Sequence, residues 1–204
     1  LTIEGKLHAI HGNLRIGESE YFVTEACEYT NSFLSFFPKI AIILNVEADH
    51  LDFFKDLDEI LESFHRFALL LPKDGTLIIN GEIEGIEKIT TGLSCNIISF
   101  GNSSDFDYYP SQIEYDQNAC GRYILNRKNG SSRSVQLSVT GEHNIINSLS
   151  ALALSDLLHI EDTIVDSALK HFHGTDRRFQ LKGEIGGITI IDDYAHHPTE
   201  ISAT

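Results

Sequence analysis

The stretch Ile40-Ala-Ile-Ile-Leu-Asn-Val46, followed at once by Glu47-Ala-Asp-His-Leu-Asp52, decides the fold of this chain. Its first part is a run of apolar, mostly branched residues, which is typical of a parallel strand covered on both faces. The polar residues that follow therefore emerge at the carboxyl end of a buried strand. Open α/β sheets bind their ligands at that end.

A helix and a second strand are predicted directly after this stretch. Residues 52–71 carry apolar side chains at helical spacing, and Pro72 marks the end of the pattern. The apolar run Thr76–Asn80 predicts another buried strand. Strand, helix and strand in this order predict a right-handed parallel crossover. The runs Tyr21–Thr24 and Cys95–Phe100 are predicted as further strands of the same sheet.

The composition of the chain changes at the start of its second half. Residues 102–139 are polar and rich in turn formers, with Asn129-Gly130 between the alternating runs Arg122–Leu125 and Val135–Val139. Asn-Gly between two such runs predicts a β-hairpin. From Gly141 the helical period returns.

Two helices and a new strand are predicted in the remaining sequence. The first helix follows Gly141 and the second covers about 163–172, ending near Gly174. A charged stretch at 175–178 then precedes alternation over 183–192, which predicts a linker and the first strand of another domain.

The fold class that follows is α/β, with a mainly parallel sheet flanked by helices and a small β-hairpin region. We predict one domain over residues 1–178 and the beginning of a second over 179–204. The chain opens on Leu1 and ends on Thr204 in mid-pattern, so we expect it to be part of a longer protein.

Charge and composition exclude several classes of function. The chain has 15 Lys and Arg against 30 Asp and Glu, a formal charge of -15, which repels nucleic acid and anionic lipid. No apolar run approaches the roughly 20 residues that span a bilayer. Three widely spaced cysteines without a Cys-x-x-Cys pair predict neither a disulfide framework nor a zinc site. We therefore expect a cytoplasmic protein with small-molecule ligands.

The first candidate site lies at the end of the strand quoted above. His50 with Asp49 or Asp52 is a possible divalent-metal site. Alternatively, these residues cap the helix that is expected to begin near Asp52, since acidic side chains are favoured at helix starts. A second predicted strand end delivers Glu25, Cys27 and Glu28. Glu25 with His50 is a plausible magnesium pair, although Glu25 taken alone is more often a surface carboxylate.

The second candidate site opens the helix after Gly141. His143, Asn144 and Asn147 crowd its first turns, where amide side chains can meet the polar edge of a ligand. Asn144 and Asn147 are three positions apart and share a face. The alternative makes Asn144 a helix cap and Asn147 a buried polar residue.

The third candidate site lies in and after the linker. Arg177 and Arg178 form either a solvated charge pair or a guanidinium site for phosphate. The run Ile190-Ile-Asp-Asp-Tyr-Ala-His-His-Pro198 places two carboxylates, a phenol and two imidazoles directly after an apolar strand. Such a concentration of reactive groups favours a functional role.

In their order along the chain, these motifs resemble those of the Mur ligases, a family of ATP- and magnesium-dependent enzymes that form amide bonds. The resemblance covers nearly the whole chain and rests on Glu25-Ala-Cys-Glu-Tyr29, Ser32-Phe-Leu34, Asn45-Val-Glu-Ala-Asp-His-Leu-Asp52, Gly141-Glu-His-Asn-Ile-Ile-Asn147, Arg177-Arg-Phe-Gln180 and Asp192-Asp-Tyr-Ala-His-His-Pro-Thr-Glu200. The last motif resembles the alanine-adding branch and its tripeptide-recycling relative.

The resemblance implies an activity in peptidoglycan synthesis. L-alanine would be joined to UDP-N-acetylmuramate after ATP converts the carboxylate of the sugar nucleotide to an acyl phosphate. Transfer of a ready-made tripeptide to the same sugar nucleotide is the alternative within the family. Outside it, the alternatives are a non-catalytic acidic binding module with this fold and a metal-dependent hydrolase built on Asp49, His50 and Asp52.

The resemblance also implies roles for residues of the predicted central ATP-binding domain. Glu25 and His50 would hold Mg²⁺ between the phosphates and the acyl carboxylate. Asn144 and Asn147, with His143 nearby, would bind the adenine and ribose of ATP.

For the linker and the expected Rossmann-like C-terminal domain, the resemblance implies a second group of ligand contacts. Arg178 would reach the ATP phosphates as a catalytic residue, and Asp192 would bind ribose. Tyr194, His196 and His197 would lie by the amino-acid pocket, with His196 as a further catalytic residue. Ligands on both sides of the linker imply domain closure during the reaction.

The chain departs from the family pattern in two ways. The family more often has Asp where Cys27 stands, and no Gly-x-x-Gly-Lys-Thr type of phosphate loop occurs anywhere in the sequence, including Ile10-His-Gly-Asn-Leu14. Without the backbone N–H groups and lysine of that loop, the β- and γ-phosphates of ATP lack their main anchor.

We therefore predict that the purified 204-residue chain is catalytically inactive by itself. Incubated with ATP, Mg²⁺, UDP-N-acetylmuramate and L-alanine, it should release no ADP above the background of a coupled assay. Measurable magnesium-dependent ADP release from this chain alone would contradict the prediction.

Overall fold

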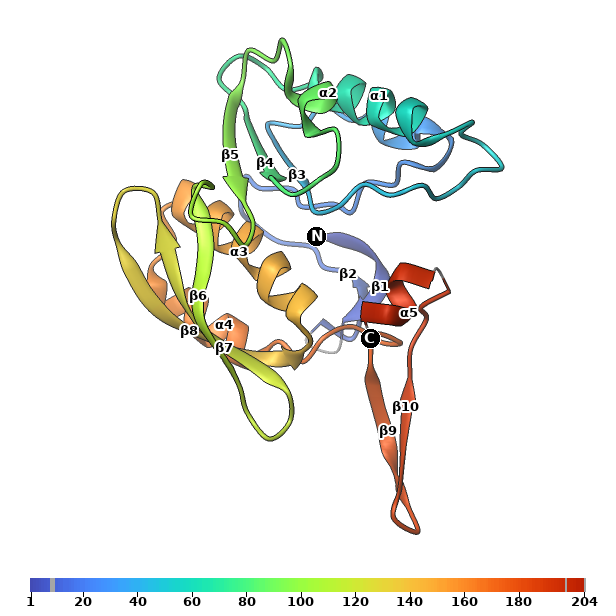
Figure 1. Cartoon of the computed structure of the whole chain (residues 1–204), viewed down its shortest axis with the longest axis vertical. Helices are drawn as coiled ribbons and strands as arrows, with labels where there is room; N and C mark the ends of the chain where they lie inside the picture. The colour runs from blue at the N-terminus through green and yellow to red at the C-terminus, as the bar shows by residue number, and fades with distance from the viewer. Residues whose placement is uncertain (8–9, 197, 204) are drawn as a thin grey trace.

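A six-stranded mixed sheet in the order β3-β4-β5-β6-β7-β8 forms the centre of the protein (Figure 1). The computed structural model describes residues 1–7, 10–196 and 198–203. The parallel half of the sheet comprises β3 (Ile40–Ile43), β4 (Thr76–Asn80) and β5 (Asn96–Phe100). The antiparallel half comprises β6 (Tyr108–Tyr115), β7 (Cys120–Arg127) and β8 (Ser132–Thr140), and β6 joins β5 in parallel.

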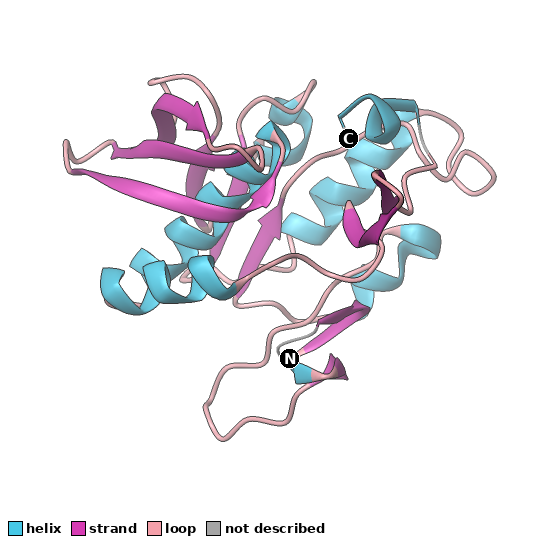
Figure 2. Ribbon diagram, turned by 90° about the horizontal axis from the view of Figure 1, so that it is seen from below, coloured by secondary structure: helices cyan, strands magenta, loops and turns pink. Residues whose placement is uncertain are grey.

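Helices and small antiparallel sheets surround the large sheet, and Figure 2 shows the helices as layers against the strands. The helices are α1 (Leu57–Ala68), α2 (Ile86–Thr90), α3 (Glu142–Leu157), α4 (Asp162–His171), α5 (Pro198–Ala203) and the 3-10 element η2 (Tyr29–Ser35). The small sheets pair β1 (Thr2–Leu7) with β2 (Gly12–Leu14) and β9 (Gln180–Ile185) with β10 (Ile188–Asp192).

Two apolar cores lie on opposite faces of the sheet, and β4 contributes to both. Leu77 and Ile79 pack into the core that contains α1 and η2. Ile78 packs into the core that contains α3 and strands β7 and β8. Successive side chains of a strand point to opposite faces. Complete burial of all three therefore requires a helical layer on each side.

The predicted strands of this sheet are largely confirmed. β4 has the predicted bounds, β5 is one residue shorter at its start, and β3 ends at Ile43 rather than Val46. The hairpin of β7 and β8 is also confirmed, with Gly130 at φ 86° in the turn. The helices after Gly141 are confirmed as α3 and α4. The sequence analysis did not predict β6 or α2.

The prediction of a buried strand at Tyr21–Thr24 is wrong. This segment forms only an isolated parallel bridge between Thr24 and Thr2, and the side chains of Tyr21, Phe22 and Val23 are exposed. Two backbone hydrogen bonds make this bridge: the Thr2 N–H donates to the Val23 carbonyl, and the Glu25 N–H donates to the Thr2 carbonyl. A strand needs a continuous neighbour, and Thr2 alone supplies too short a partner.

The expected helix start near Asp52 is also wrong. Helix α1 begins at Leu57, because Asp56 is its N-cap and the Asp56 carboxylate accepts a hydrogen bond from the Glu59 N–H at 3.0 Å. Asp52 lies in a turn before the helix, where its carboxylate accepts a hydrogen bond from Tyr29 instead.

The single strand predicted over 183–192 is a hairpin of two strands, β9 and β10. Gly186 and Gly187 turn the chain with φ angles of 60° and 78°, which glycine adopts without steric cost. Figure 1 shows this hairpin extending away from the large sheet, with Ile185 and Ile188 at its exposed tip.

Helix α3 is joined to the antiparallel half of the sheet by buried and half-buried polar contacts. Arg127 makes two hydrogen bonds to the Asp156 carboxylate, at 2.6 and 3.0 Å, and the Tyr108 hydroxyl donates to the same group at 2.8 Å. The buried hydroxyls of Tyr123 and Ser148 lie 2.6 Å apart. These contacts fix the middle and the C-terminal end of α3 against the sheet. In the part of the chain that the structure describes, no helix has the length and apolar character to cross a membrane.

We predict that Phe67→Ala strongly destabilises the protein. Phe67 is 6% exposed, and its ring stacks on Phe33 with centroids 4.6 Å apart. Removing such a side chain from a core costs about 3–5 kcal/mol of unfolding free energy. The neighbouring Leu69 is 53% exposed, so Leu69→Ala should stay within about 0.5 kcal/mol of wild type. Denaturant unfolding with equal losses for the two variants would contradict this packing.

Candidate functional site

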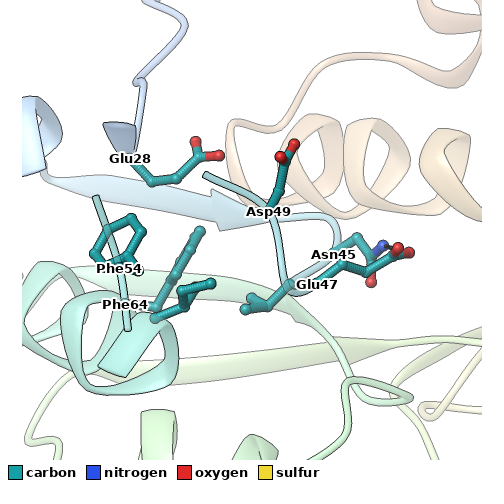
Figure 3. Close-up of a pocket in the computed structure, with 8 residues that line it drawn as sticks. Glu28, Asn45, Glu47, Asp49, Phe54 and Phe64 are labelled. Carbon is teal, nitrogen blue, oxygen red and sulfur yellow. Dashed lines mark hydrogen bonds between the residues drawn. The ribbon is translucent and has the colours of Figure 1, made fainter. Parts of the chain in front are cut away.

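The loop after β3 and the segment before η2 form the wall of a cavity of about 170 Å³. Figure 3 shows the carboxylates of Glu28 and Asp49 pointing the same way, away from the rings of Phe54 and Phe64. The cavity therefore has an acidic mouth and an aromatic floor. Its lining residues are Glu28, Asn45, Val46, Glu47, Asp49, Phe54, Ile60 and Phe64.

His50 stands next to this mouth in a strained backbone conformation. Its φ angle of 53° lies in the left-handed region, which is uncommon for residues other than glycine. Asp49 accepts a hydrogen bond from the His50 N–H at 2.6 Å, while the His50 carbonyl accepts from the Phe53 and Phe54 N–H groups at 2.9 Å each. These bonds hold the main chain of the loop at His50.

The imidazole of His50 contacts two residues at the start of η2. His50 Nε2 lies 3.5 Å from Glu28 Oε1, and the His50 and Tyr29 ring centroids are 4.6 Å apart. The Tyr29 hydroxyl donates to Asp52 Oδ2 at 2.8 Å, and this bond, with the negative charge of that carboxylate, raises the pKa of Tyr29 above its usual value. Asp49 and Asp52 thus both take part in holding this loop.

Glu25, the other predicted magnesium ligand, lies three residues before Glu28. Its side chain is exposed, and its N–H donates to the Thr2 carbonyl at 3.0 Å. Among residues 1–7, 10–196 and 198–203, no group of three or more His, Cys, Asp or Glu side chains is arranged to hold a metal ion.

The start of α3 positions the second group of predicted residues. Gly141 precedes the helix with a φ angle of 92°, and the His143 ring folds back so closely that a β-carbon on Gly141 would lie 2.6 Å from His143 Cε1. The Asn144 amide donates to the Thr140 carbonyl at 2.7 Å and lies 3.2 Å from His143 Nε2. Asn144 therefore ties the helix start to the end of β8 and orients the exposed His143 ring.

Asn147 lies one turn further along α3 and is half-buried. In the described part of the chain its side-chain amide makes no hydrogen bond, whereas its carbonyl accepts from the Ser150 hydroxyl at 2.7 Å. The Asn147 amide is not among the buried unsatisfied side-chain groups of the described residues, so its atoms reach solvent.

The linker residues are organised around Asp193, which the sequence analysis did not select. Its two carboxylate oxygens accept hydrogen bonds from the N–H groups of Phe179 and Ala195, both at 2.6 Å. Burial alone would raise the pKa of Asp193, but these two bonds and the nearby positive charges of Arg178 and His143 lower it below its usual range. Asp193 therefore joins the two ends of the β9–β10 hairpin.

Tyr194 and His196, two of the three predicted amino-acid-pocket residues, come together. Their ring centroids are 5.3 Å apart, and His196 Nδ1 lies 3.2 Å from the Tyr194 carbonyl. The Arg177 guanidinium lies over the Tyr194 ring at 4.4 Å, and the Tyr194 N–H donates to the Arg177 carbonyl at 2.8 Å. His197 lies outside the described residues.

The remaining predicted residues lie at the base of the hairpin. Asp192 Oδ2 is 3.4 Å from Lys182 Nζ, and Arg178 is exposed, with its N–H donating to the Thr175 carbonyl at 3.3 Å. Asp192 and Arg178 therefore have carboxylate and guanidinium groups near solvent.

Sequence reasoning placed Glu28 at the same predicted strand end as Glu25 but missed Tyr29 and Asp193 as parts of these sites. Tyr29 was visible only as a neighbour of Glu28, and Asp193 only as the second carboxylate of an Asp-Asp pair. Their contacts join segments 14 to 23 residues apart in the chain, so no local pattern contains them.

Two family models match the sequence of this chain. The family model for the Mur ligase middle domain matches residues 5–155, and the model for the Mur ligase, glutamate ligase domain, matches residues 177–204. A UDP-N-acetylmuramate--L-alanine ligase from Agathobacter rectalis is 52% identical over 204 residues, which are 100% of this chain and 44% of the relative. The chain thus spans less than half of the length of this relative.

Two solved structures extend the comparison. The UDP-N-acetylmuramate-alanine ligase MurC from Thermotoga maritima superposes with a TM-score of 0.81 at 26% identity, over 99% of this chain and 45% of the other. A murein peptide ligase from Psychrobacter arcticus gives a TM-score of 0.66 at 28% identity, over 94% of this chain and 42% of the other.

We predict that Asp193→Asn selectively weakens protection of the Phe179 and Ala195 amides from hydrogen exchange. At neutral pH these two amides should exchange about threefold to tenfold more slowly in wild type than in the variant. The reason is that solvent screening reduces the contribution of a charge-assisted hydrogen bond to roughly 1 kcal/mol. The pKa of Asp193 is lower in the folded state than in the unfolded state. The difference in exchange rate between wild type and variant is therefore fully present above the unfolded-state pKa of about 3.9, and it is lost as the pH falls through the folded-state pKa. Comparing wild type and variant at the same pH removes the intrinsic pH dependence of amide exchange. A ratio of variant rate to wild-type rate that grows towards low pH would contradict the role of the ionised Asp193 carboxylate.

Proposed function

Because this chain belongs to the Mur ligase family, we propose that it is the central part of a ligase that joins L-alanine to UDP-N-acetylmuramate with ATP and Mg²⁺. In this proposal the carboxylate of the sugar nucleotide becomes an acyl phosphate, which the amino group of alanine attacks. The product belongs to peptidoglycan synthesis. The observation that carries the proposal is the 52% identity with the alanine ligase of Agathobacter rectalis over every residue of this chain.

The residues at the end of β3 fit a role at Mg²⁺. His50 and Glu28 are side by side, and Glu25 precedes Glu28 on the same segment with an exposed side chain. Mg²⁺ is commonly bound by one or two carboxylates together with substrate phosphates and water. When bound, the ion would neutralise phosphate charge during acyl transfer. We propose Glu25 and His50 as its ligands, with Glu28 beside His50 as the adjoining carboxylate.

The start of α3 fits a role at the adenine and ribose of ATP. The Asn147 amide has no partner in the described chain, and the exposed His143 ring is oriented by Asn144. Amide groups can donate and accept together, which suits the mixed donor and acceptor edge of adenine. We propose that Asn147 and His143 contact the nucleotide and that Asn144 contributes while holding the helix start.

The linker residues fit the roles of binding phosphate, ribose and amino acid. We propose that Arg178 binds the ATP phosphates, since its planar guanidinium is suited to phosphate oxygens, and that Asp192 binds ribose. Tyr194 and His196, packed together beneath Arg177, would border the amino-acid pocket with His197. These groups lie on both sides of the linker, so binding would draw the two domains together.

Transfer of a tripeptide to the same sugar nucleotide is the second candidate function. The fold match to the murein peptide ligase of Psychrobacter arcticus favours it. The higher TM-score of the alanine ligase from Thermotoga maritima supports alanine as the first choice. Cys95 and Cys120 are free thiols, which supports the cytoplasmic location that we propose for either enzyme.

We predict that the full-length enzyme containing this chain releases ADP with L-alanine as acceptor and not with the L-alanyl-D-glutamyl-diaminopimelate tripeptide. His50→Ala should lower kcat by about a hundredfold, as expected when a metal ligand is lost. Asn147→Ala should raise the KM for ATP about tenfold, because one hydrogen bond contributes roughly 1.4 kcal/mol.

His171→Ala is the matched control, because His171 is exposed on α4 and its Nδ1 lies 2.7 Å from the Ser167 carbonyl of its own helix. This variant should keep wild-type kinetics. Turnover with the tripeptide alone would replace the first candidate by the second. Wild-type turnover of His50→Ala would remove His50 from the proposed magnesium site.

A further inference from the structure

Tyr29 connects the two chain segments that form the proposed magnesium site. It directly follows Glu28, and its ring lies against the imidazole of His50 with centroids 4.6 Å apart and an angle of 30° between the planes. Its hydroxyl donates to Asp52 Oδ2 at 2.8 Å. One side chain thus contacts the residues on both sides of Leu51 in the His50 loop.

The Tyr29 ring is itself held in place by neighbours. The Phe53 ring meets it edge-on with centroids 6.0 Å apart. The Tyr29 carbonyl accepts a hydrogen bond from the Ser32 hydroxyl at 2.9 Å, and that hydroxyl also donates to the Cys27 carbonyl at 3.0 Å. The ring therefore projects from a fixed backbone turn rather than from a loose segment.

The His50 loop needs such a contact. A residue other than glycine in the left-handed region costs of order 1 kcal/mol or more and persists only when its surroundings determine it. The backbone bonds of His50 hold its main chain at a φ of 53°. These bonds leave rotation of the imidazole about its side-chain torsions undetermined. Tyr29 on one face and Glu28 at Nε2 are the recorded contacts that limit this rotation.

We propose that Tyr29 is a positioning residue, which stacks on His50 and uses its hydroxyl bond to Asp52 to hold the imidazole in the orientation needed at Mg²⁺. The inference rests on the proposed role of His50 as a magnesium ligand. The ring supplies the stacking surface, and the hydroxyl fixes the ring relative to the loop. Groups that orient a metal ligand commonly affect metal affinity by about 10- to 100-fold.

The test compares Tyr29→Phe, Tyr29→Ala and Asp52→Asn in the full-length enzyme. Tyr29→Phe keeps the ring and removes the hydroxyl, and Asp52→Asn weakens the same hydrogen bond from the other side. Tyr21→Phe is the matched control, because Tyr21 is exposed outside the site. Retained melting temperature and circular dichroism would show which variants are folded.

The first readout is the Cε1 proton resonance of His50 in histidine-labelled enzyme, assigned with His50→Ala. Stacking on Tyr29 shifts this resonance through the ring current in the absence of any metal. Tyr29→Ala should abolish the shift, and Tyr29→Phe should retain most of it. An unchanged resonance in folded Tyr29→Ala would overturn the stacking geometry.

The second readout is the Mn²⁺ concentration that half-broadens this resonance in the presence of a non-hydrolysable ATP analogue. Tyr29→Ala should require about tenfold more Mn²⁺, while Tyr29→Phe and Asp52→Asn should share a smaller increase. A purely structural role would lower the melting temperature without changing this concentration, and that result would overturn the proposal.

His50→Ala separates failure of this inference from failure of the proposed function. Mn²⁺ binding in the His50→Ala enzyme is followed by water-proton relaxation. If this variant binds Mn²⁺ as wild type does, the role of His50 and with it the role of Tyr29 are both rejected. If His50→Ala loses affinity while Tyr29→Ala keeps it, only the inference about Tyr29 is rejected.

Discussion

Burial of β4 on both faces is the constraint on which the rest of the structure depends. Leu77, Ile78 and Ile79 are consecutive and almost completely inaccessible to solvent. Because their side chains alternate between faces, α1 must cover one side and α3 the other. Their backbone groups are paired on both edges by β3 and β5. This arrangement fixes the end of β3 and the start of α3, from which the candidate site residues project.

The site residues are held by polar contacts rather than by apolar burial. Four of these residues are exposed or half-buried: Glu28, Tyr29, Asp49 and Asp52. Glu28 contacts the His50 ring, Tyr29 donates to Asp52, and Asp49 accepts from the His50 N–H. Such contacts are individually weak at the surface, but together they hold a loop that includes a left-handed residue. The same pattern recurs in the linker, where Asp193 accepts two backbone hydrogen bonds. Both loops combine local order with solvent access, which ligand binding requires.

In the proposed enzyme, the linker joins the two domains. Arg177 packs on Tyr194, and Asp193 joins the base of the β9–β10 hairpin while responding to the charges of Arg178 and His143. In the proposed function, the start of α3 and the residues after the linker bind the same reactants, so ligand binding would draw the two domains together.

The sequence by itself determined the elements whose cause is local. Runs of branched apolar residues predicted β3, β4 and β5, the Asn129-Gly130 turn predicted the β7–β8 hairpin, and helical periodicity predicted α1, α3 and α4. Polar residues at strand ends and helix starts likewise located His50, Asn144 and Asn147 as candidates. Tyr21–Thr24 failed as a strand because an apolar run cannot report whether a neighbouring strand is present.

Only the tertiary structure decided which side chains meet. It placed Glu28 and Tyr29 against His50 and bound Asp193 to Phe179. It also moved the start of α1 from the vicinity of Asp52 to Leu57, since Asp56 rather than Asp52 caps the helix. The physical reason is that periodicity records burial along one segment, whereas these contacts depend on side-chain directions from segments that the fold alone brings together.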